Sequence, residues 1–466
     1  MKIDVNTIQK GASSAHSPLY DELIRTDSRT VEQPLQETGA FVGEGGPVPR
    51  SRYTSPEFAE LEKRHIWAKT WQFVCREEDL PEVGDRMAYE VPGLSIFVVR
   101  SGEKAFKAFY NSCLHRGTRL CAEHGAEERI RCPFHGWTWN LDGTVQELPG
   151  KWDFPHVTDE KFGLPQVKVD TWGGNIFINP DPDSASLQSA LGVLVDHFKD
   201  YDFENRWTAV NVRKKIRGNW KNAMEAFLEG WHLSETHGQA QAWNGDSSAQ
   251  YDIWEDEHSQ VSRSITPSAV PSPELGEEGD PRLAVIETCK ATALPGVDLP
   301  DFDAIETLDR AFAAEWRRKM LTAMTGVDAS AHSDSYMLDA TQYFMFPNWF
   351  PWFGEGAPLF YQFRPTPDKN PDTCIFEVRL LLPLPANGEK PPCAPLQELD
   401  FDETMQSADA GFGLFDEVFD QDMSNIPLVQ QGQYAGSPDT RHIQLGVYQE
   451  CRIQAFHARL ARMCGV

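Results

Sequence analysis

Two short pairs of cysteine and histidine constrain this chain more than any other feature of its sequence. Cys113 and His115 form the first pair, and Cys132 and His135 form the second, with 16 residues between the pairs. The same donors could hold a tetrahedral zinc ion, but zinc sites more often keep like ligands together. Each pair here offers one thiolate and one imidazole, as a [2Fe–2S] cluster with two cysteines on one iron and two histidines on the other requires. The spacing therefore favours the iron–sulfur cluster over zinc.

The residues around these pairs resemble a known family. The stretches SCLHRG and CPFHGW resemble the Rieske motif, and RYTSPEFAELEKRHIWAKTWQFVCREEDLPEVGD resembles the lead-in of the Rieske oxygenase large subunits. The resemblance runs from about Arg52 to the C-terminus and is weakest between about Ser259 and Ala340. It implies a Rieske non-haem iron oxygenase large (alpha) subunit of the aromatic-ring-hydroxylating type, which needs a second, mononuclear Fe(II) site.

The stretch from Gly218 to His237, GNWKNAMEAFLEGWHLSETH, offers residues for that second site. Two histidines and one carboxylate on one face of an iron leave positions open for O2. Glu229 and His232 are three residues apart and share one face of a regular helix. His232 and His237 are five apart, about 140° around such a helix, so they cannot both reach one metal. We therefore expect a π-type turn or a break near Leu233–Thr236.

The third ligand must come from elsewhere in the chain. The segment FDEVFDQDMSNIPLVQQG matches the family's acidic helix, in which an Asp precedes a Gln-x-Gly at a fixed interval. By that resemblance Asp422 is the ligand, and Gln430 and Gly432 are the markers. Other acids lie close by, and a run of charge is usually a solvated helix face. Asp420 therefore stays open as the alternative.

The resemblance also gives Glu229 a catalytic role. It takes the place of a carboxylate, more often Asp, that bridges a ligand His and a Rieske His of a neighbouring subunit. Carboxylates of this kind fix the tautomer of a ligand His and raise its basicity. The electron would pass from His135 through Glu229 to His232, which requires a closed ring of subunits, most simply a homotrimer. Glu225 departs from the family pattern, because many relatives carry an amide there.

Composition and charge narrow the setting. The chain has 466 residues, 40% of them hydrophobic, with nine Cys and a net charge of −27. No apolar run is long enough for a membrane span, and the N-terminus lacks the apolar core of a secretory signal. The odd number of cysteines indicates reduced thiols and a cytoplasmic location. The negative charge argues against partners such as nucleic acid or anionic membranes.

The charge is nevertheless uneven along the sequence. Between Arg100 and His135 seven Lys or Arg stand against four acids. A locally basic cluster domain suits docking of an acidic electron carrier. We therefore expect Arg116 and Arg119 to contribute to that docking, although random scatter of surface charge is the simpler alternative.

These patterns predict an α+β protein in three parts. They are an N-terminal arm (1–50), a small all-β Rieske [2Fe–2S] domain with a lead-in helix (51–169), and a catalytic domain (170–466) with a curved antiparallel sheet gripping helices, of the helix-grip type. We expect much of the arm to lack fixed structure unless it wraps a partner subunit. We expect the stretch 255–300, which is rich in Ser, Pro, Glu and Gly, to form a long loop. Loops of this length in an enzyme are often lids. The other expected elements are helices at 54–68, 186–201 and 302–324, strands at 87–91, 94–100, 105–111, 207–220, 343–353, 359–367 and 374–383, and a hairpin turn at 140–143.

The resemblance implies a terminal oxygenase component. It would take electrons, ultimately from NAD(P)H, through a ferredoxin and/or a flavin reductase, and it would hydroxylate an apolar, aromatic or cyclic compound with O2. Mono- and cis-dihydroxylation are both open, and so is a small β subunit. Two alternatives remain: a Rieske oxidative demethylase of a small substrate, and an electron-transfer Rieske protein with a ligand-binding domain.

Overall fold

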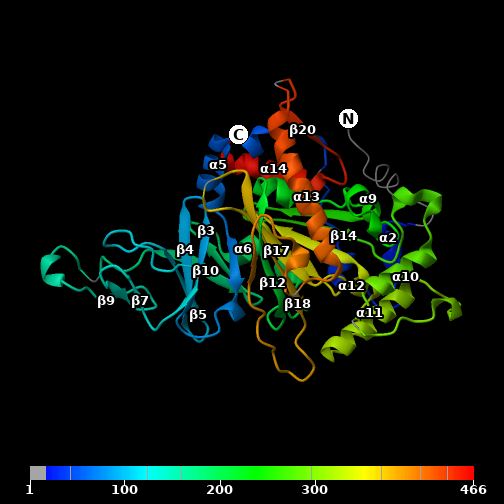
Figure 1. The fold of residues 1–466 in the computed structure, drawn as a ribbon, viewed down its shortest axis with the longest axis horizontal. Helices are drawn as coiled ribbons and strands as arrows, with labels where there is room; N and C mark the ends of the chain where they lie inside the picture. The colour runs from blue at the N-terminus through cyan, green and yellow to red at the C-terminus, as the bar shows by residue number, and fades with distance from the viewer. Residues whose placement is uncertain are drawn as a thin grey trace. The chain divides into compact units, whose positions relative to one another are not determined.

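The computed structural model describes residues 17–41, 43–122, 124–158, 160–294, 296–368, 370–409, 411–437 and 439–466. It is a mixed α and β structure (Figure 1). Its contacts divide the chain into two compact units. The smaller unit comprises Ala59–Ala190 and Pro365–Asn370, and the larger unit comprises the chain up to Phe58, Leu191–Arg364 and Pro371–Val466.

The smaller unit is built on β-sheets, as expected for the cluster domain. A seven-stranded sheet has the order β2-β11-β10-β5-β4-β3-β6, and a three-stranded sheet has the order β7-β8-β9. The strands are β2 (Gln72–Arg76), β3 (Asp85–Val91), β4 (Leu94–Gly102), β5 (Ala105–Tyr110), β6 (His124–Ala126), β7 (Ile130–Arg131), β8 (Thr138–Trp139), β9 (Val145–Glu147), β10 (Gln166–Trp172) and β11 (Asn175–Asn179). The three strands predicted between residues 87 and 111 are present, because alternating apolar side chains along them fill one core.

Two local predictions in this region are confirmed. The hairpin turn at 140–143 closes with a hydrogen bond from Gly143 N to Asn140 O at 2.9 Å. Gly143 has φ +87°, and a Cβ there would collide with the ring of Phe109. The lead-in helix α5 (Pro56–Glu62) begins where the hydroxyl of Ser55 accepts a hydrogen bond from Phe58 N, and it continues as a π-helical turn over Lys63–Trp67.

The small sheet extends beyond the boundary expected at Val169. Strand β11 follows β10 and pairs with both β10 and β2, so residues up to Asn179 belong to this sheet. The compact unit itself runs to Ala190. Strand β11 is therefore the last strand of the small sheet and not the start of the catalytic domain. Its apolar residues Ile176, Phe177 and Ile178 are completely buried.

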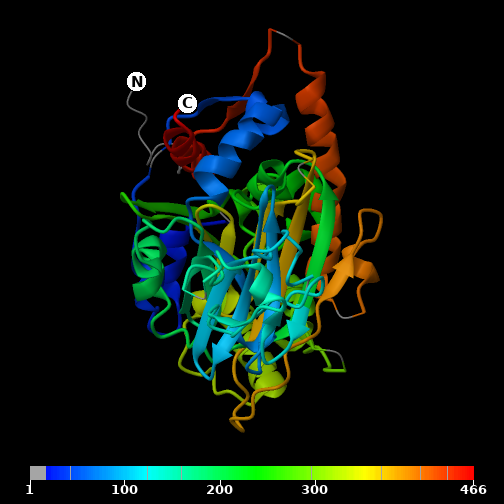
Figure 2. The same cartoon turned by 90° about the vertical axis from the view of Figure 1, so that its left-hand side faces the viewer.

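The larger unit contains an eight-stranded sheet with the order β13-β14-β15-β16-β17-β18-β12-β19. Its strands are β12 (Trp207–Arg217), β13 (Gln250–Glu255), β14 (Gln260–Thr266), β15 (Ala340–Met345), β16 (Trp349–Phe353), β17 (Leu359–Pro365), β18 (Thr373–Leu382) and β19 (Gln397–Leu399). Helices α8 (Trp220–Glu225), α13 (Leu414–Ala435) and α14 (Cys451–Cys464) pack on this sheet. The longest of the three, α13, is drawn in orange-red in Figure 2. The predicted class of a curled antiparallel sheet holding helices is confirmed.

The expectation of a long loop over 255–300 is wrong. Strand β14 and helix α10 (Pro281–Ala291) lie inside it. Helix α11 (Arg310–Thr325) also begins later than the predicted helix at 302–324. The side chains of Asp280 and Asp309 accept hydrogen bonds from the first turns of α10 and α11, so the polar residues are helix caps rather than loop signals.

Two further predicted elements are each divided in the structure. The helix expected at 186–201 is two short helices, α6 (Leu187–Leu191) and α7 (Leu194–His197), because Gly192 between them takes φ +52°. The strand expected at 343–353 is the pair β15 and β16, which are antiparallel neighbours.

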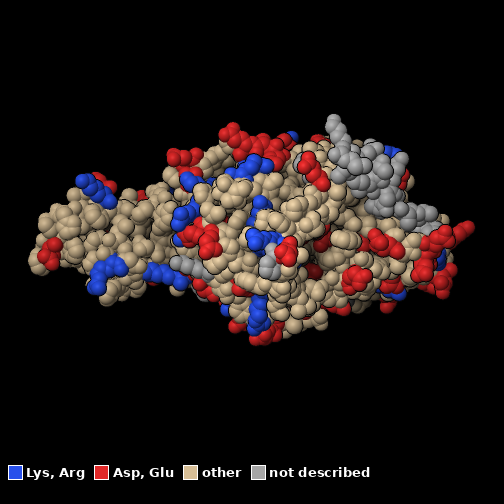
Figure 3. Space-filling model, turned by 90° about the horizontal axis from the view of Figure 1, so that it is seen from above, with Lys and Arg blue, Asp and Glu red and all other residues tan. Residues whose placement is uncertain are grey.

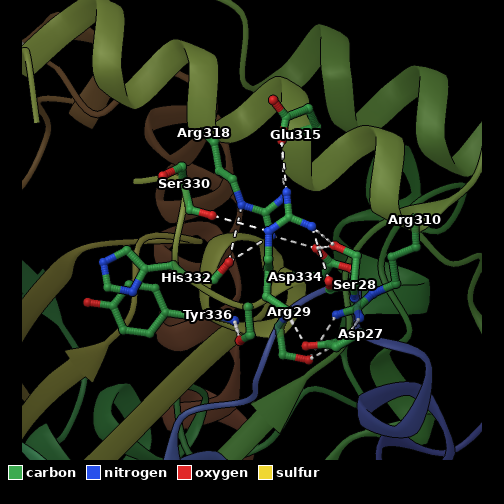
Figure 4. A network of polar contacts seen from close by, with 12 residues as sticks. Asp27, Ser28, Arg29, Arg310, Glu315, Arg318, Ser330, His332, Asp334 and Tyr336 are labelled. Carbon is green, nitrogen blue, oxygen red and sulfur yellow. Dashed lines mark hydrogen bonds and ion pairs between the residues drawn. The ribbon is translucent and has the colours of Figure 1, made fainter. Parts of the chain in front are cut away.

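The described part of the N-terminal arm is ordered on the larger unit. Residues 1–16 lie outside the described residues. Beyond them Tyr20 and Leu35 are each 1% exposed. Figure 4 shows how polar groups continue this contact, with Ser28 bound to the Asp334 carboxylate by its N–H and its hydroxyl, both at 2.7 Å. The expectation of an arm without fixed structure therefore fails for residues 17–41 and 43–50.

No disulfide joins any of the nine cysteines, all of which lie within the described residues. Acidic side chains gather beside scattered basic ones on the face drawn in Figure 3, in keeping with the net charge of −27. Within the described residues, no helix combines the length and the apolar character that a membrane crossing needs.

Candidate metal centres

The two Cys–His pairs lie on two loops with the same backbone geometry. Cys113 N donates to Thr118 O, and Cys132 N donates to Trp137 O, both at 2.8 Å. In each loop the carbonyl of the cysteine accepts a hydrogen bond from a glycine four residues later, at 2.8 Å for Gly117 and 3.0 Å for Gly136. Both glycines have φ near +75°, which lets each loop turn back sharply so that its Cys and His project together.

The two cysteine side chains lie together, and so do the two histidine rings. Cys113 and Cys132 are 3% and 1% exposed, and their thiols interact directly. The rings of His115 and His135 lie 4.5 Å apart, centroid to centroid. Burial raises the pKa of the Cys113 thiol, whereas backbone hydrogen bonds outweigh burial and lower the pKa of Cys132.

This arrangement fits a [2Fe–2S] cluster. Two thiols on one side and two imidazoles on the other suit a cluster in which one iron takes both cysteines and the other iron takes both histidines. His115 Nδ1 is buried without a hydrogen-bond partner in the described part of the chain, which leaves it available as a ligand. The ring of His115 stacks on Trp137 at 5.1 Å and 11°, so its orientation is fixed.

The second candidate site lies on the larger unit where the predicted helix breaks. Helix α8 ends at Glu225, and a single helical turn, α9, follows at Leu233–Thr236. The break therefore lies before Leu233 rather than within Leu233–Thr236. Glu229 is not helical, so the expectation that it shares a helix face with His232 is wrong. His237 follows the turn with φ −118° and ψ 47°, which redirects its side chain.

His232, His237 and Asp422 come together at one point. Their ligand atoms all lie within 4.8 Å of one another. Asp422 Oδ1 is 3.3 Å from His232 Nε2 and 3.1 Å from His237 Nε2. Asp422 and His237 are buried, and His232 is half-buried. Two imidazoles and one carboxylate around one point, with one side partly open, form the arrangement that non-haem Fe(II) oxygenases use.

The Nδ1 atoms of His232 and His237 are each held by a neighbouring side chain. His232 Nδ1 lies 2.7 Å from Glu229 Oε1, and His237 Nδ1 lies 2.7 Å from Gln421 Oε1. These acceptors leave Nε2 of each ring directed at Asp422. The carboxylate of Glu229 also accepts hydrogen bonds from the backbone N–H of Trp231 and of His232. Gln421 was not predicted, and only its place next to Asp422 could have suggested it.

The electrostatics of this site favour a cation. Burial lowers the pKa of His232, but the carboxylates of Glu229 and Asp422 outweigh it and raise the pKa to about 10. Burial raises the pKa of Asp422, whereas hydrogen bonds from His232 and His237 bring it below its usual value. Negative charge collected at a buried point is stabilised by a positive ion.

Asp420, the alternative ligand, points to a different place. Its carboxylate accepts hydrogen bonds from Met405 N at 2.6 Å and Gln406 N at 3.2 Å. Gln430 links α13 to the start of α8, because its side-chain oxygen accepts from Asn219 N at 3.0 Å and from Asn222 Nδ2 at 2.7 Å. The structure thus brings Asp422, and not Asp420, to the two histidines.

Glu225 joins a buried group that the sequence did not predict. It accepts a hydrogen bond from the Tyr53 hydroxyl at 2.8 Å and lies 2.8 Å from His457 Nε2. This contact ties the N-terminal helix α4 (Ser51–Thr54) and the C-terminal helix α14 to the helix that precedes the histidines. Two residues after Glu225, Phe227 packs among buried aromatic rings, 5.3 Å from Tyr361 and 6.0 Å from Phe419.

Comparison with known proteins identifies two family domains along the chain. Residues 70–158 match the Rieske [2Fe-2S] domain family, and residues 198–465 match the catalytic domain of the ring hydroxylating alpha subunits. This chain belongs to the Rieske non-haem iron oxygenases. The family architecture carries a Rieske cluster and a mononuclear iron and draws electrons from a reductase.

Three curated relatives illustrate the range of the family. The chain is 30% identical to the carnitine monooxygenase oxygenase subunit of Escherichia coli, over 42% of this chain and 53% of the relative. It is 29% identical to the glycine betaine monooxygenase oxygenase subunit of Pseudomonas aeruginosa, over 41% and 44%. It is 32% identical to the biphenyl 2,3-dioxygenase subunit alpha of Rhodococcus jostii, over 40% and 41%. The matches thus span about half the length of these relatives.

A solved structure shares the fold across nearly the whole chain. The quaternary ammonium Rieske monooxygenase in complex with L-carnitine superimposes with a TM-score of 0.58 at 18% identity, covering 90% of this chain and 95% of that one.

Proposed function

We propose that this chain is the terminal oxygenase component of an O2-dependent system that oxidises a quaternary ammonium compound. The observation that carries the oxygenase activity is the convergence of His232, His237 and Asp422 within 4.8 Å, backed by hydrogen-bond acceptors on both imidazoles. A plain electron-transfer protein has no use for such a site, which weighs against that alternative.

Each residue has a distinct role in this proposal. Cys113 and Cys132 would hold one iron of the cluster, and His115 and His135 the other. His232, His237 and Asp422 would hold the mononuclear iron, which supplies O2 activation beside the substrate. Glu229 accepts a hydrogen bond from Nδ1–H of His232 and so keeps Nε2 free for the metal.

Glu229 is also our candidate for the electron bridge between subunits. One of its carboxylate oxygens accepts from His232 Nδ1, and the other accepts from two backbone N–H groups. A Rieske His135 of a neighbouring subunit would bind the same carboxylate. Such head-to-tail contacts close only in a ring, so we propose a homotrimer, reduced by a ferredoxin or flavin reductase.

The substrate proposal draws on the relatives and on the aromatic surroundings. Carnitine and glycine betaine monooxygenase subunits are similar to this chain, and aromatic faces such as Phe227, Tyr361 and Phe419 attract quaternary ammonium groups. Insertion of one oxygen atom into a C–H bond beside the nitrogen uses O2, two electrons and two protons and releases water. The hydroxylated product then loses the amine, which is a demethylation where a methyl group is attacked.

Hydroxylation of an aromatic ring, which the sequence resemblance led us to expect, is the second candidate. The similarity to the biphenyl dioxygenase alpha subunit and the same apolar rings favour it. Turnover assays with a generic reductase decide between the two. We expect oxygen uptake and aldehyde release with quaternary ammonium compounds, whereas diol formation from biphenyl without aldehyde would reject our first choice.

Two metal-deficient variants test the ring. His135→Ala and Asp422→Ala should each be inactive alone. When the two are co-expressed, mixed rings place an intact cluster beside an intact iron site across a subunit boundary, and part of the activity should return. Verified mixed oligomers without activity would show that the electron stays within one chain.

A further inference from the structure

Arg452, the second residue of α14, is completely buried in the larger unit. Its side chain is held by four neutral acceptors. Nε donates to Ser262 Oγ at 3.1 Å. Nη1 lies 2.8 Å from Ser264 Oγ, 2.8 Å from Gln342 Oε1 and 3.4 Å from Leu228 O. The residue is 1% exposed.

The second terminal nitrogen of Arg452 is not satisfied. Nη2 is buried and has no hydrogen-bond partner among the described residues. Burial lowers the pKa of Arg452 to about 10, so the guanidinium is still charged at neutral pH. A buried cation without a counter-ion and with free N–H donors is costly, because nothing replaces the water it has lost.

Four other arginines of this unit, buried or nearly so, are each paired with a carboxylate. The pairs are Arg206 with Glu355, Arg263 with Asp252, Arg310 with Asp27 and Asp339, and Arg318 with Asp334. Figure 4 shows two of them, Arg310 beside Asp27 and Arg318 beside Asp334. Arg452 departs from this pattern, since no ion pair to it is found in the described part of the chain.

The carboxylate of Asp252 does not pair with Arg452, although its negative charge raises the pKa of Arg452. Its Oδ2 is bound by Arg263 at 2.6 Å, and its Oδ1 accepts a hydrogen bond from Gly39 N at 2.8 Å. Both oxygens are therefore engaged elsewhere, and no other carboxylate among the described residues pairs with Arg452.

Arg452 lies beside the segment that carries the candidate iron ligands. Leu228, whose carbonyl it contacts, directly precedes Glu229. Gln342, which accepts from Nη1, donates through its amide to the Tyr361 hydroxyl. Burial and the carboxylate of Asp422 both raise the pKa of Tyr361, which places Tyr361 within the field of the iron site. Arg452 thus contacts the segment that leads into Glu229 and, through Gln342, a tyrosine on which the Asp422 carboxylate acts.

We propose that Arg452 binds a carboxylate group of the substrate through Nη2, so that the compound oxidised here is an anion or a zwitterion. This inference rests on the proposed oxygenase function. Nη2 carries two N–H groups without a partner among the described residues, which suit the oxygens of a carboxylate, and the pairing removes the cost of the unpaired charge. Together with a quaternary ammonium group it defines a betaine, with its charges held at opposite ends.

Paired ligands that differ in the carboxylate test this inference. The iron-loaded full-length protein is titrated without oxygen with glycine betaine and with choline, which has the same ammonium group and an alcohol. Benzoate and benzyl alcohol form a second pair without the ammonium group. In the wild type we expect the carboxylate member of at least one pair to bind about 10- to 100-fold more tightly, the range for a hydrogen bond to a charged group.

Two variants assign the preference to Arg452. Arg452→Met, which removes the charge at similar length, should bind both members of a pair equally. Arg452→Lys should keep part of the preference, because the charge remains but the paired donors do not. A preference that survives unchanged in both variants would overturn the inference.

Thermal unfolding separates a binding role from a structural one. Without ligand, Arg452→Met should lower the midpoint much less than the matched Arg263→Met, which strands the buried Asp252 carboxylate. If Arg452→Met unfolds as readily as Arg263→Met, and Arg452→Lys keeps the full carboxylate preference, the residue is structural and the inference fails.

The outcomes also distinguish this inference from the proposed function. A preference for benzoate that depends on Arg452, without oxidation of glycine betaine, supports the carboxylate site and rejects the quaternary ammonium substrate. Equal turnover of choline and glycine betaine, unaffected by Arg452→Met, supports that substrate class and rejects the carboxylate site. If acetate stabilises the wild type as strongly as glycine betaine does, Arg452 binds a free anion and not the substrate. That result would also reject the inference.

Discussion

Glu229 Oε1 lies 2.7 Å from His232 Nδ1, and this contact determines which nitrogen of the imidazole faces Asp422. A carboxylate so placed both orients the ligand and adds negative charge to it. Because the segment around Glu229 is not helical, its side chain can turn back to reach His232 and two backbone N–H groups at once.

Glu229→Gln should keep both metal sites loaded but slow the transfer of electrons to the mononuclear iron by about 10- to 100-fold, because the hydrogen bond loses its charge. Rapid mixing of the dithionite-reduced protein with substrate and O2 measures the rate at which the cluster is reoxidised. Reoxidation at the wild-type rate would remove Glu229 from the electron path.

Asp422→Ala should lose the mononuclear iron and all turnover while the spectrum of the cluster stays normal. Iron analysis should fall from about three to about two per chain, since a [2Fe–2S] cluster accounts for two. Asp420→Ala is the matched control, because that carboxylate bonds Met405 N and Gln406 N instead. Loss of the third iron in the control, and not in Asp422→Ala, would reverse the assignment.

His135→Cys should load a cluster with a reduction potential lower by on the order of 100 mV or more, because a thiolate adds negative charge. His124→Cys places the same new thiol on β6, away from the paired loops, and should leave the potential unchanged. Redox titration followed by circular dichroism measures both. An unaltered potential in loaded His135→Cys would count against His135 as a ligand.

Arg116→Glu should slow reduction by an acidic carrier protein and weaken its dependence on salt, whereas reduction by dithionite should not change. The structure makes the single substitution the better test, because Arg119 donates to Cys121 O and pairs with Glu90 at 3.0 Å. Lys104→Glu, the same charge change on another turn, is the control. Carrier reduction that is equally slow in both variants would reflect net charge rather than docking.

The buried His457 should make the larger unit less stable in acid. Burial lowers its pKa, and Arg52 adds to this against the opposing effect of Glu225. In the unfolded chain the pKa of this His is about 6.5, above its pKa in the folded protein. Below about pH 6.5 the unfolded state therefore binds more protons than the folded state, and the free energy of unfolding falls as the pH falls. In urea unfolding at pH 7.5 and 5, His457→Gln should show a smaller loss than the wild type, and an equal loss would contradict the prediction.

The sequence was most informative where the ligands of a site are close along the chain. Cys113 and His115, like Cys132 and His135, are held by single tight loops, so their spacing already favours one kind of metal site. The same is true of His232 and His237, whose separation required a break in the helix. Its position was not predictable, because it depends on tertiary contacts such as those of Phe227 with Tyr361 and Phe419.

Tertiary structure decided what lies far apart in the sequence. Asp422 reaches His237 across 185 residues, and neither charge nor periodicity separates it from Asp420 on the same helix. Only the packing of α13 turns Asp422 toward the histidines and Asp420 toward Met405 N. The unpaired state of Arg452 is likewise invisible in the sequence, since it depends on neutral neighbours from β14, β15 and the histidine segment, brought together when the sheet closes around its helices.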